Sequence, residues 1–258
     1  MNPLNRKLVL ITGASAGIGE ACAHGFAKMG ANLILTARRE DKLKALAKRL
    51  EEEFSITVLP LALDVRDEKA VKVLLSKLPV HMKEIDILVN NAGLVLGVEK
   101  AHQTPYNDVD VMLDTNVKGV LNLIRNVVPD MVSRNAGHVI NISSIAGHEA
   151  YPGGSVYCAS KHAVDALTKS LRMDVVDTAL RVTAISPGLV DTEFSTVRFK
   201  GDTKKAEAVY KGLEALVAED IAEAVLFAAS RPPHVQIADM IIFPTQQAAA
   251  TVVHRRND

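Results

Sequence analysis

The sequence predicts an α/β protein with one doubly wound parallel sheet. Two observations support this prediction: short apolar runs alternate strictly with amphipathic helical segments through the first half of the chain, and a glycine-rich turn follows the first apolar run. No linker, internal repeat or low-complexity stretch divides the 258 residues. We therefore expect a single domain over residues 1–258, with ligands bound at the carboxyl ends of the strands.

Composition excludes several classes of function. The 30 basic residues balance 30 acidic ones, which argues against a nucleic-acid surface or a polybasic membrane patch. No apolar run is long enough to span a bilayer, and the run after the N-terminus stops at Thr12-Gly13. Cys22 and Cys158 show neither metal nor disulfide spacing, and the histidines are scattered. We expect a cytoplasmic protein without a metal.

The first predicted unit has the parts of a phosphate-binding cradle. A buried strand over Leu8–Ile11 leads into the turn Thr12–Gly19, which a helix over Glu20–Lys28 follows. Glycines let the backbone approach a pyrophosphate, and a helix N-terminus presents free N–H groups. The spacing is G-x-x-x-G-x-G rather than G-x-G-x-x-G, so the glycines could also simply form a tight turn. The candidate cofactor contacts are Gly13, Ser15, Gly17, Ile18 and Gly19.

The second strand, Asn32–Thr36, predicts which cofactor binds. An acidic residue at this strand end holds the ribose 2′-hydroxyl of NAD, whereas arginine accommodates the 2′-phosphate of NADP. Here Ala37 is followed by Arg38 and Arg39, and arginine is a good bidentate phosphate ligand. We therefore predict NADP, with Ser15 as a further contact. The alternative is that the two arginines are solvated at the start of the helix over Asp41–Glu53.

Two further strands end in polar residues. The third, Ile56–Leu63, contains Pro60 and precedes Asp64-Val65, where Asp64 either accepts from the adenine amino group or caps the helix over Glu68–Leu78. The fourth, Ile85–Val89, precedes Asn90-Asn91-Ala92-Gly93. Two amides at this position either tie neighbouring strands together or line the cofactor crevice.

The next elements carry the candidate catalytic groups. A helical stretch over Tyr106–Arg134 includes Asn116, and the strand His138–Ile142 closes with Ser143-Ser144, whose hydroxyls suit a site or a cap. A helix that starts at the turn Gly153-Gly154-Ser155, which contains a candidate N-cap, carries Tyr157 and Lys161. These two lie one turn apart on one face. A cation favours the phenolate of a group that otherwise titrates near pH 10, although Y-x-x-x-K also arises by accident.

The last third of the chain predicts a lid. A strand over Arg181–Ile185 ends in Ser186-Pro187-Gly188, and residues 189–216 begin with poor periodicity beside the expected crevice. Helices over Lys204–Leu216 and Glu219–Ala229 and a strand over Met240–Phe243 follow. The Ala-rich tail, Gln246–Val253, either packs against a sister subunit or is frayed.

Together these motifs resemble the short-chain dehydrogenase/reductase superfamily from Lys7 to about His254. The resemblance lies in the order and spacing of five motifs: Thr12–Gly19, Asn90–Gly93, Ser144, the Tyr157/Lys161 pair and Pro187-Gly188. It implies a Rossmann-like seven-stranded sheet and hydride transfer between nicotinamide and a carbinol carbon. It also implies that Tyr157 is the general acid/base, that Lys161 binds the nicotinamide ribose and lowers the tyrosine pKa, that Ser144 holds the substrate oxygen and that Asn116 holds a relay water. Further expected cofactor contacts are Asp64, Val65, Asn91, Ala92, Gly93, Tyr157, Lys161, Pro187, Gly188, Val190 and Thr192.

A narrower likeness concerns the substrate. Asn90–Gly97, Asp114–Gly119 and Val197–Asp202 look like the NADP-dependent 3-hydroxy acid dehydrogenases, tetramers that oxidise serine, L-allo-threonine and 3-hydroxyisobutyrate. The substrate carboxylate would pair with Arg198 or Lys200 in the lid. Many NADP-preferring relatives place a basic residue where this chain has Ala16, so Arg38 and Arg39 must carry the preference. The alternatives are an NADPH-dependent carbonyl reductase of neutral ketones and a non-catalytic NADP-binding module. His148 and Tyr151 are expected to flank the pocket without an assigned role.

Overall fold

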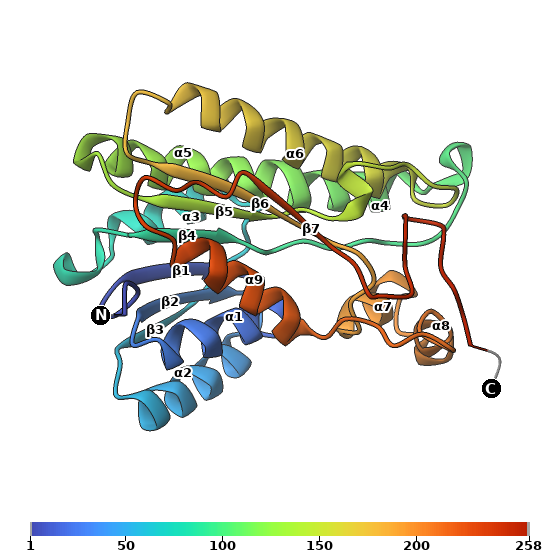
Figure 1. Ribbon diagram of the computed structural model, residues 1–258, viewed down its shortest axis with the longest axis horizontal. Coiled ribbons are helices and arrows are strands. Elements are labelled where there is room, and N and C mark those ends of the chain that lie inside the picture. The colour runs from blue at the N-terminus through green and yellow to red at the C-terminus, as the bar shows by residue number, and fades with distance from the viewer. Residues whose placement is uncertain (1, 257–258) are drawn as a thin grey trace.

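A seven-stranded parallel sheet forms the centre of the protein (Figure 1), as the computed structural model, which describes residues 2–256, shows. The strand order is β3-β2-β1-β4-β5-β6-β7. The chain starts at β1, proceeds outward to β3, returns to β4 beside β1 and then proceeds to β7. The order therefore reverses between β1 and β4, which confirms the doubly wound prediction and places a crevice at their carboxyl ends.

The strands lie within a few residues of their predicted positions. They are β1 Leu8–Thr12, β2 Asn32–Ala37, β3 Val58–Ala62, β4 Ile87–Asn90, β5 His138–Ile142, β6 Arg181–Pro187 and β7 Asp239–Ile242. Pro60 lies inside β3, opposite Leu35 of β2. The sheet accommodates this proline because β3 is an edge strand with only one neighbour to bond.

Helices cover both faces of the sheet (Figure 1). Side chains alternate between the faces along each strand, so Val9 and Ile11 of β1 pack in one core cluster, and Leu8 and Leu10 in the other. The first cluster includes α1 (Gly17–Lys28), α2 (Glu40–Phe54) and α9 (Ala218–Ala229). The second includes α3 (Glu68–Ser76), α5 (Gly119–Arg134) and α6 (Ser155–Asp174). Short 3-10 turns lie at Val80–Met82, Ala101–Gln103 and Ile145–Gly147.

The predicted helical stretch Tyr106–Arg134 is continuous but not uniform. It consists of α4 (Tyr106–Leu113), a π turn at Asp114–Lys118 and α5. The turn carries Asn116. The N-cap of α6 is Gly154, within the predicted turn Gly153-Gly154-Ser155, and Ser155 is already helical.

The lid differs from its prediction. The poor periodicity of this segment gave no sign of a six-residue helix, α7 (Glu193–Arg198). The Thr192 hydroxyl caps this helix by accepting from the Phe194 N–H at 3.3 Å. The helix predicted over Lys204–Leu216 is wrong beyond Ala208, where α8 (Thr203–Ala208) ends. The chain then turns at Gly212, whose φ of +70° suits glycine. Leu216 returns to the segment after β6, with its N–H donating to the Leu189 carbonyl at 3.1 Å.

Residues 246–253 are held in place by the contacts below, so the frayed alternative for Gln246–Val253 is wrong. Gln247 and Val253 form an antiparallel bridge, and the Ala250 N–H donates to the Glu149 carboxylate at 2.8 Å. Within residues 2–256, none of the helices combines the length and the apolar composition that a membrane crossing requires.

Candidate active site

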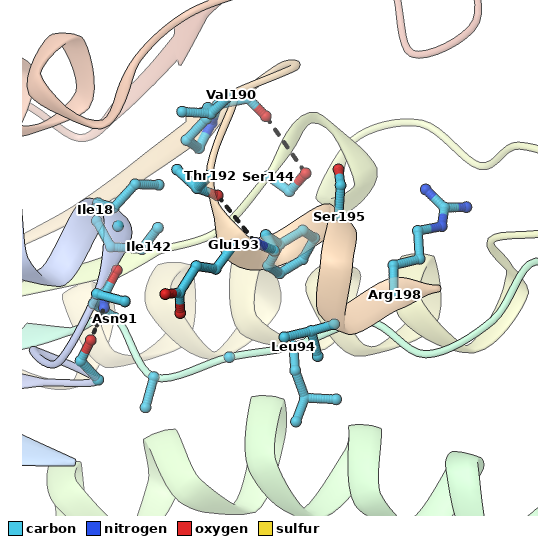
Figure 2. Close-up of a pocket in the computed structure, with 18 of the residues that line it drawn as sticks. Ile18, Asn91, Leu94, Ile142, Ser144, Val190, Thr192, Glu193, Ser195 and Arg198 are labelled. Carbon is cyan, nitrogen blue, oxygen red and sulfur yellow. Dashed lines mark hydrogen bonds between the residues drawn. The ribbon is translucent and has the colours of Figure 1, made fainter. Parts of the chain in front are cut away.

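A cavity of about 470 Å³ opens where the carboxyl ends of β1, β2, β4, β5 and β6 meet the lid. Figure 2 shows part of its lining, with α7 of the lid beside the ends of the strands. Most of the predicted site residues line it: Gly13, Ser15, Gly17, Ile18, Arg38, Arg39, Asp64, Val65, Asn91, Ala92, Gly93, Ser144, Tyr157, Lys161, Pro187, Gly188, Val190, Thr192 and Arg198. Gly19 and Asn116 do not line the cavity but support residues that do.

The glycine turn is shaped for close approach. Gly13 has a φ of +67°, in the left-handed region that favours glycine. A Cβ at Gly19 would lie 2.5 Å from the Asn91 amide nitrogen and closer still to the Gly13 carbonyl. Gly19 therefore lets α1 pack against the ends of β1 and β4. The N-cap of α1 is Ala16, which has no side-chain acceptor, so the first N–H groups of α1 remain available to an anion.

The two asparagines after β4 have different roles. The Asn90 amide donates to the Asn141 side chain at 2.9 Å and so ties β4 to β5. The Asn91 amide donates to the Thr12 carbonyl at 2.9 Å, and the Asn91 N–H donates to the Thr12 hydroxyl at 3.0 Å. Asn91 thus ties β4 to β1 and also lines the cavity, so both predicted alternatives occur.

Arg38 and Arg39 lie at the far end of the cavity but have different partners. Arg39 donates to the Glu193 carboxylate at 2.9 Å and to the Ser15 hydroxyl at 3.1 Å. The ion pair holds the pKa of Glu193 below its usual range and joins the segment after β2 to the lid. Arg38 forms no hydrogen bond or ion pair with any residue in 2–256. Its guanidinium is therefore the one available to a ligand.

Asp64 is not a helix cap, so that alternative is wrong. Arg66 donates to both Asp64 carboxylate oxygens at distances of 2.6 to 3.0 Å. This fork lowers the pKa of Asp64. Asp67 caps α3 instead, since its carboxylate accepts from the Ala70 N–H at 2.9 Å. A contact between Asp64 and an adenine amino group stays a prediction.

Tyr157, Ser144 and Lys161 converge on the opposite end of the cavity. The Tyr157 ring packs edge-on to Phe194 of the lid, with 5.8 Å between ring centroids. Ser144 follows β5 and caps the next turn, because its hydroxyl accepts from the Ala146 N–H at 3.1 Å. Lys161 lies 5.9 Å from the Tyr157 ring centroid and donates to the Ile142 carbonyl at 2.8 Å.

Burial dominates the pKa of Tyr157. Burial raises this pKa above its ordinary value, while the Ser144 hydrogen bond and the charge of Arg198 lower it to a smaller extent. Lys161 is itself buried, which lowers its own pKa to about 8. Burial thus outweighs the neighbouring charges, and the Lys161 ammonium bonds to the Ile142 carbonyl, so the lowering of the tyrosine pKa by Lys161 stays a prediction.

Asn116 lies beneath this group, 1% exposed. Its side chain accepts from the Leu94 N–H at 2.9 Å and donates to the Leu94 carbonyl at 2.8 Å and to the Ser160 hydroxyl at 3.0 Å. Ser160 in turn donates to the Tyr157 carbonyl at 2.7 Å. Asn116 thus fixes the loop after β4 against the helix that carries Tyr157, and its role in a water relay stays a prediction.

The lid brings one of its two candidate cations to the cavity. Arg198 lines the cavity, with its guanidinium carbon 6.0 Å from the Tyr151 ring centroid, and donates to the Gly97 carbonyl at 3.3 Å. Lys200 does not line the cavity, because its ammonium pairs with the buried Asp108 carboxylate at 2.7 Å. The alternative that Lys200 binds the substrate is therefore wrong.

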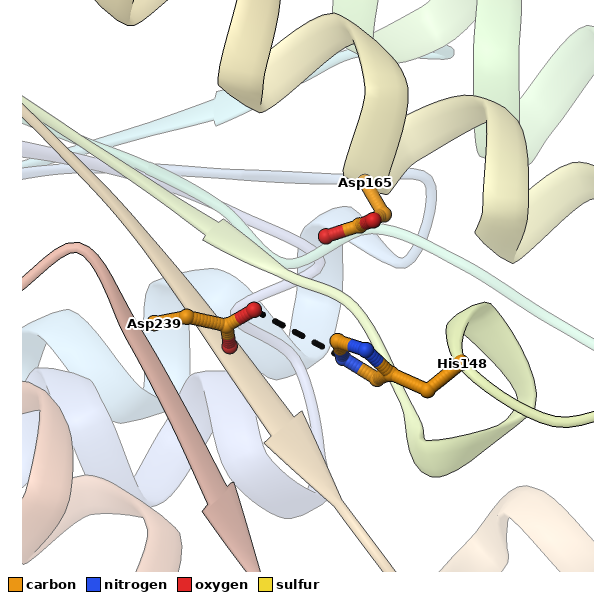
Figure 3. A group of neighbouring side chains, drawn as sticks. All are labelled: His148, Asp165 and Asp239. Atoms are coloured by element: carbon orange, nitrogen blue, oxygen red, sulfur yellow. Dashed lines mark ion pairs between the residues drawn. The ribbon is translucent and has the colours of Figure 1, made fainter.

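Tyr151 lines the cavity as expected, whereas His148 does not. Figure 3 shows His148 beside Asp165 and Asp239. The His148 ring nitrogen is 3.0 Å from the Ser186 hydroxyl and 3.7 Å from the Asp239 carboxylate. Together with Asp165 these groups form a cluster with ligating atoms within 4.8 Å of one another. The Lys169 ammonium already neutralises Asp165 at 2.6 Å, so we read the cluster as an internal polar network.

Glu193, Tyr210 and Gln247 are among the lining residues that no sequence motif indicated. The Tyr210 hydroxyl donates to the Val190 carbonyl at 2.8 Å and lies 2.6 Å from the Ser195 hydroxyl, so it joins the two parts of the lid. A signal existed only for the segment that carries Glu193, namely the capping Thr192 before it.

The fold and the constellation at Tyr157 define a class of protein, and the chain belongs to the short-chain dehydrogenase family, whose model matches residues 7–203. Within that family it is similar to an NADP-dependent 3-hydroxy acid dehydrogenase of Schizosaccharomyces pombe, with 46% identity over 99% of both chains. It is 48% identical to an NADP-dependent 3-hydroxy acid dehydrogenase of Salmonella typhi, over 96% of this chain and 99% of that one. A solved structure of serine dehydrogenase in a closed form with NADP+ superimposes with a TM-score of 0.90 and 46% identity, over 96% of this chain and all of that one.

Proposed function

We propose that this protein is an NADP-dependent dehydrogenase of short 3-hydroxy acids, such as serine, L-allo-threonine or 3-hydroxyisobutyrate, and of the matching semialdehydes. The observation that carries the proposal is that Tyr157, Ser144 and Arg198 line one cavity. The first two can handle a hydroxyl oxygen and its proton, and the third can bind a carboxylate. The relatives above are named as dehydrogenases of 3-hydroxy acids or serine, which carry both a hydroxyl and a carboxylate.

The residues present fit NADP. When bound, the cofactor supplies a nicotinamide carbon that accepts or donates hydride. The glycine turn and the N-terminus of α1 would hold the pyrophosphate, since Gly13 and Gly19 leave no side chain in the way. Arg38 would bind the 2′-phosphate, because its guanidinium lines the cavity and Arg39 is occupied by Glu193. Lys161 would donate to the nicotinamide ribose.

Tyr157 would transfer the proton. Burial keeps its phenol protonated at neutral pH, the form that donates a proton when an aldehyde is reduced. In the oxidative direction the phenol must first lose its proton, and the charges of Lys161 and Arg198 favour that loss. Ser144 would hold the substrate oxygen near the phenol, since both side chains line the cavity. A hydrogen bond from Ser144 also lowers the pKa of Tyr157.

Arg198 would recognise the substrate carboxylate by a charge-assisted fork. The Tyr151 ring and the Gly97 carbonyl hold its guanidinium at the cavity wall. Because α7 of the lid carries Arg198, binding of the carboxylate would also draw the lid toward Tyr157. A neutral ketone offers no such contact, which distinguishes the proposal from a general carbonyl reductase.

For assembly and location, we propose a cytoplasmic homotetramer. The layer of α4 and α6 exposes large apolar side chains at Tyr106 (87%), Met173 (72%) and, just after α6, Val176 (82%), and partner subunits would cover this apolar surface. Light scattering coupled to size exclusion measures the subunit count directly. A mass near four times 27.8 kDa supports the proposal, and a monomer contradicts it.

The experiment for the activity is the initial rate of absorbance change at 340 nm with L-serine, L-allo-threonine, 3-hydroxyisobutyrate and a neutral secondary alcohol, each with NADP and with NAD. We expect turnover of the acids with NADP. Turnover of only the neutral alcohol would favour the carbonyl reductase. No turnover of any substrate, together with tight NADP binding, would favour the non-catalytic module.

A further inference from the structure

After β7 the chain crosses the cavity as a strap, residues 246–256. Figure 1 shows it in red, passing α7 and α8 on its way to the C-terminus. Residues 247–253 of the strap form a turn, in which Gln247 and Val253 form an antiparallel bridge and the Ala248 N–H donates to the Val252 carbonyl at 2.9 Å. Gln247 and Ala250 line the cavity. The strap is therefore one of the walls of the site.

Gln247 fixes the backbone that follows β6. Its side chain is 5% exposed, and its amide oxygen accepts from the Leu189 N–H at 2.8 Å while its amide nitrogen donates to the Ala249 carbonyl at 3.1 Å. A Cβ at Gly188 would collide with that amide oxygen. Gln247 thus occupies the space that Gly188 leaves and holds the segment Gly188–Val190, which lines the cavity.

Two more anchors tie the strap to the other walls. The Ala250 N–H donates to the Glu149 carboxylate, and the Glu149 N–H donates to the Ile145 carbonyl at 2.9 Å, in the turn that Ser144 caps. On the lid side, the Glu214 N–H donates to the Gln246 amide oxygen at 2.9 Å. Arg255 donates to the Val209 and Lys211 carbonyls at 2.9 and 2.7 Å. The strap therefore links the β6 wall, the Ser144 wall and the lid.

We infer that the strap belongs to the active site and that Gln247 is a positioning residue for the dehydrogenase reaction. It acts through the Leu189 N–H and touches none of the reacting atoms. By holding Gly188–Val190 at a fixed distance from the Ser144 turn, it sets the width of the cavity at its reacting end. The inference rests on the proposed function for its kinetic consequence, but the restraint on Leu189 does not depend on that function.

Gln236 provides a matched control. Its amide oxygen accepts from the Val182 N–H at 2.7 Å, near the amino end of the same strand β6 and away from the cavity. Gln247→Met and Gln236→Met therefore each remove one bond from a glutamine oxygen to a backbone N–H. We expect about a tenfold fall in kcat with a hydroxy acid and NADP for Gln247→Met only, since displacement of reacting groups by a fraction of an ångström costs rate. Gln236→Met should lower Tm and leave kcat within twofold.

Hydrogen exchange in the cofactor-free protein gives a readout that needs no activity. The Leu189 amide should exchange at least tenfold faster in Gln247→Met than in the wild type, with no change in Gln236→Met. A second pair tests the Glu149 anchor: Glu149→Ala should lower kcat several-fold, and Glu149→Gln, which keeps an acceptor for the Ala250 N–H, should restore it. This pair also tests the positioning role of the strap if Gln247→Met does not fold.

Equal effects of the two glutamine variants on kcat, or equal rates for Glu149→Ala and Glu149→Gln, would overturn the positioning role. An unchanged exchange rate at Leu189 would overturn the restraint itself. If the wild type oxidises no hydroxy acid with NADP, the proposed function fails. The exchange data still test whether Gln247 restrains the Leu189 N–H.

Discussion

Replacement of Arg38 by alanine tests how the protein selects its cofactor. Arg38 follows β2, its side chain is exposed, and its guanidinium has no partner among residues 2–256, so a bound 2′-phosphate would be its main contact. A hydrogen bond to a charged group contributes about 1.5–3 kcal/mol, and exposure places Arg38 at the lower end of that range. We therefore expect the KM for NADP to rise roughly 10- to 30-fold.

The assay is the initial rate at 340 nm with a saturating hydroxy acid and varied NADP or NAD. The KM for NAD should change little, because NAD has no 2′-phosphate, so the preference for NADP falls by the same factor. Arg49→Ala is the matched control, since Arg49 pairs with Glu20 at the surface and does not line the cavity. Equal changes in the two KM values, or the same effect from Arg49→Ala, would refute this reasoning.

Three further predictions follow from the site and the core. Tyr157→Phe should lower kcat by about 10² to 10⁴ with little change in NADP affinity, because a general acid is lost; a rate within threefold of wild type would exclude that role. Arg198→Ala should raise the KM for hydroxy acids at least about tenfold without affecting a neutral alcohol, whereas Lys200→Ala should lower Tm and leave the KM unchanged. Burial lowers the pKa of His138 to about 3 from 6.5. As the pH falls below 6.5, the unfolded chain therefore takes up a proton at this residue while the folded protein does not. The free energy of unfolding decreases as a result. Urea unfolding at pH 7.5 and 5.0 should show about 2 kcal/mol from this residue, and His138→Gln should lose that part of the pH dependence; an unchanged dependence would contradict it.

Local patterns predicted the fold because the elements are locally consistent. Alternation of apolar strands with amphipathic helices indicates a parallel sheet without any knowledge of which residues touch. The i, i+4 spacing alone places Tyr157 and Lys161 on one face of a helix. Asp67 shows the limit of such patterns. The sequence indicated Asp64 as a possible cap, but in the structure Arg66 pairs with Asp64, and Asp67 caps α3.

Contacts between distant segments could not be predicted. Arg39 and Glu193 are 154 positions apart, so nothing near Arg39 shows that it is neutralised while Arg38 is available. The burial that raises the pKa of Tyr157 depends on Phe194 and the rest of the lid, which local periodicity does not describe. Gln247 lies in an Ala-rich tail with no motif, and its role depends on Gly188, 59 positions earlier in the numbering.

The most direct test of the central claim is the transfer of deuterium from 3-hydroxyisobutyrate labelled at its hydroxyl-bearing carbon to NADP, followed by mass spectrometry of the NADPH formed. We predict one deuterium in each NADPH produced by the wild type, and at least about a hundredfold slower formation of the same product by Tyr157→Phe. NADPH without deuterium, or no NADPH from any hydroxy acid, would contradict the proposed function.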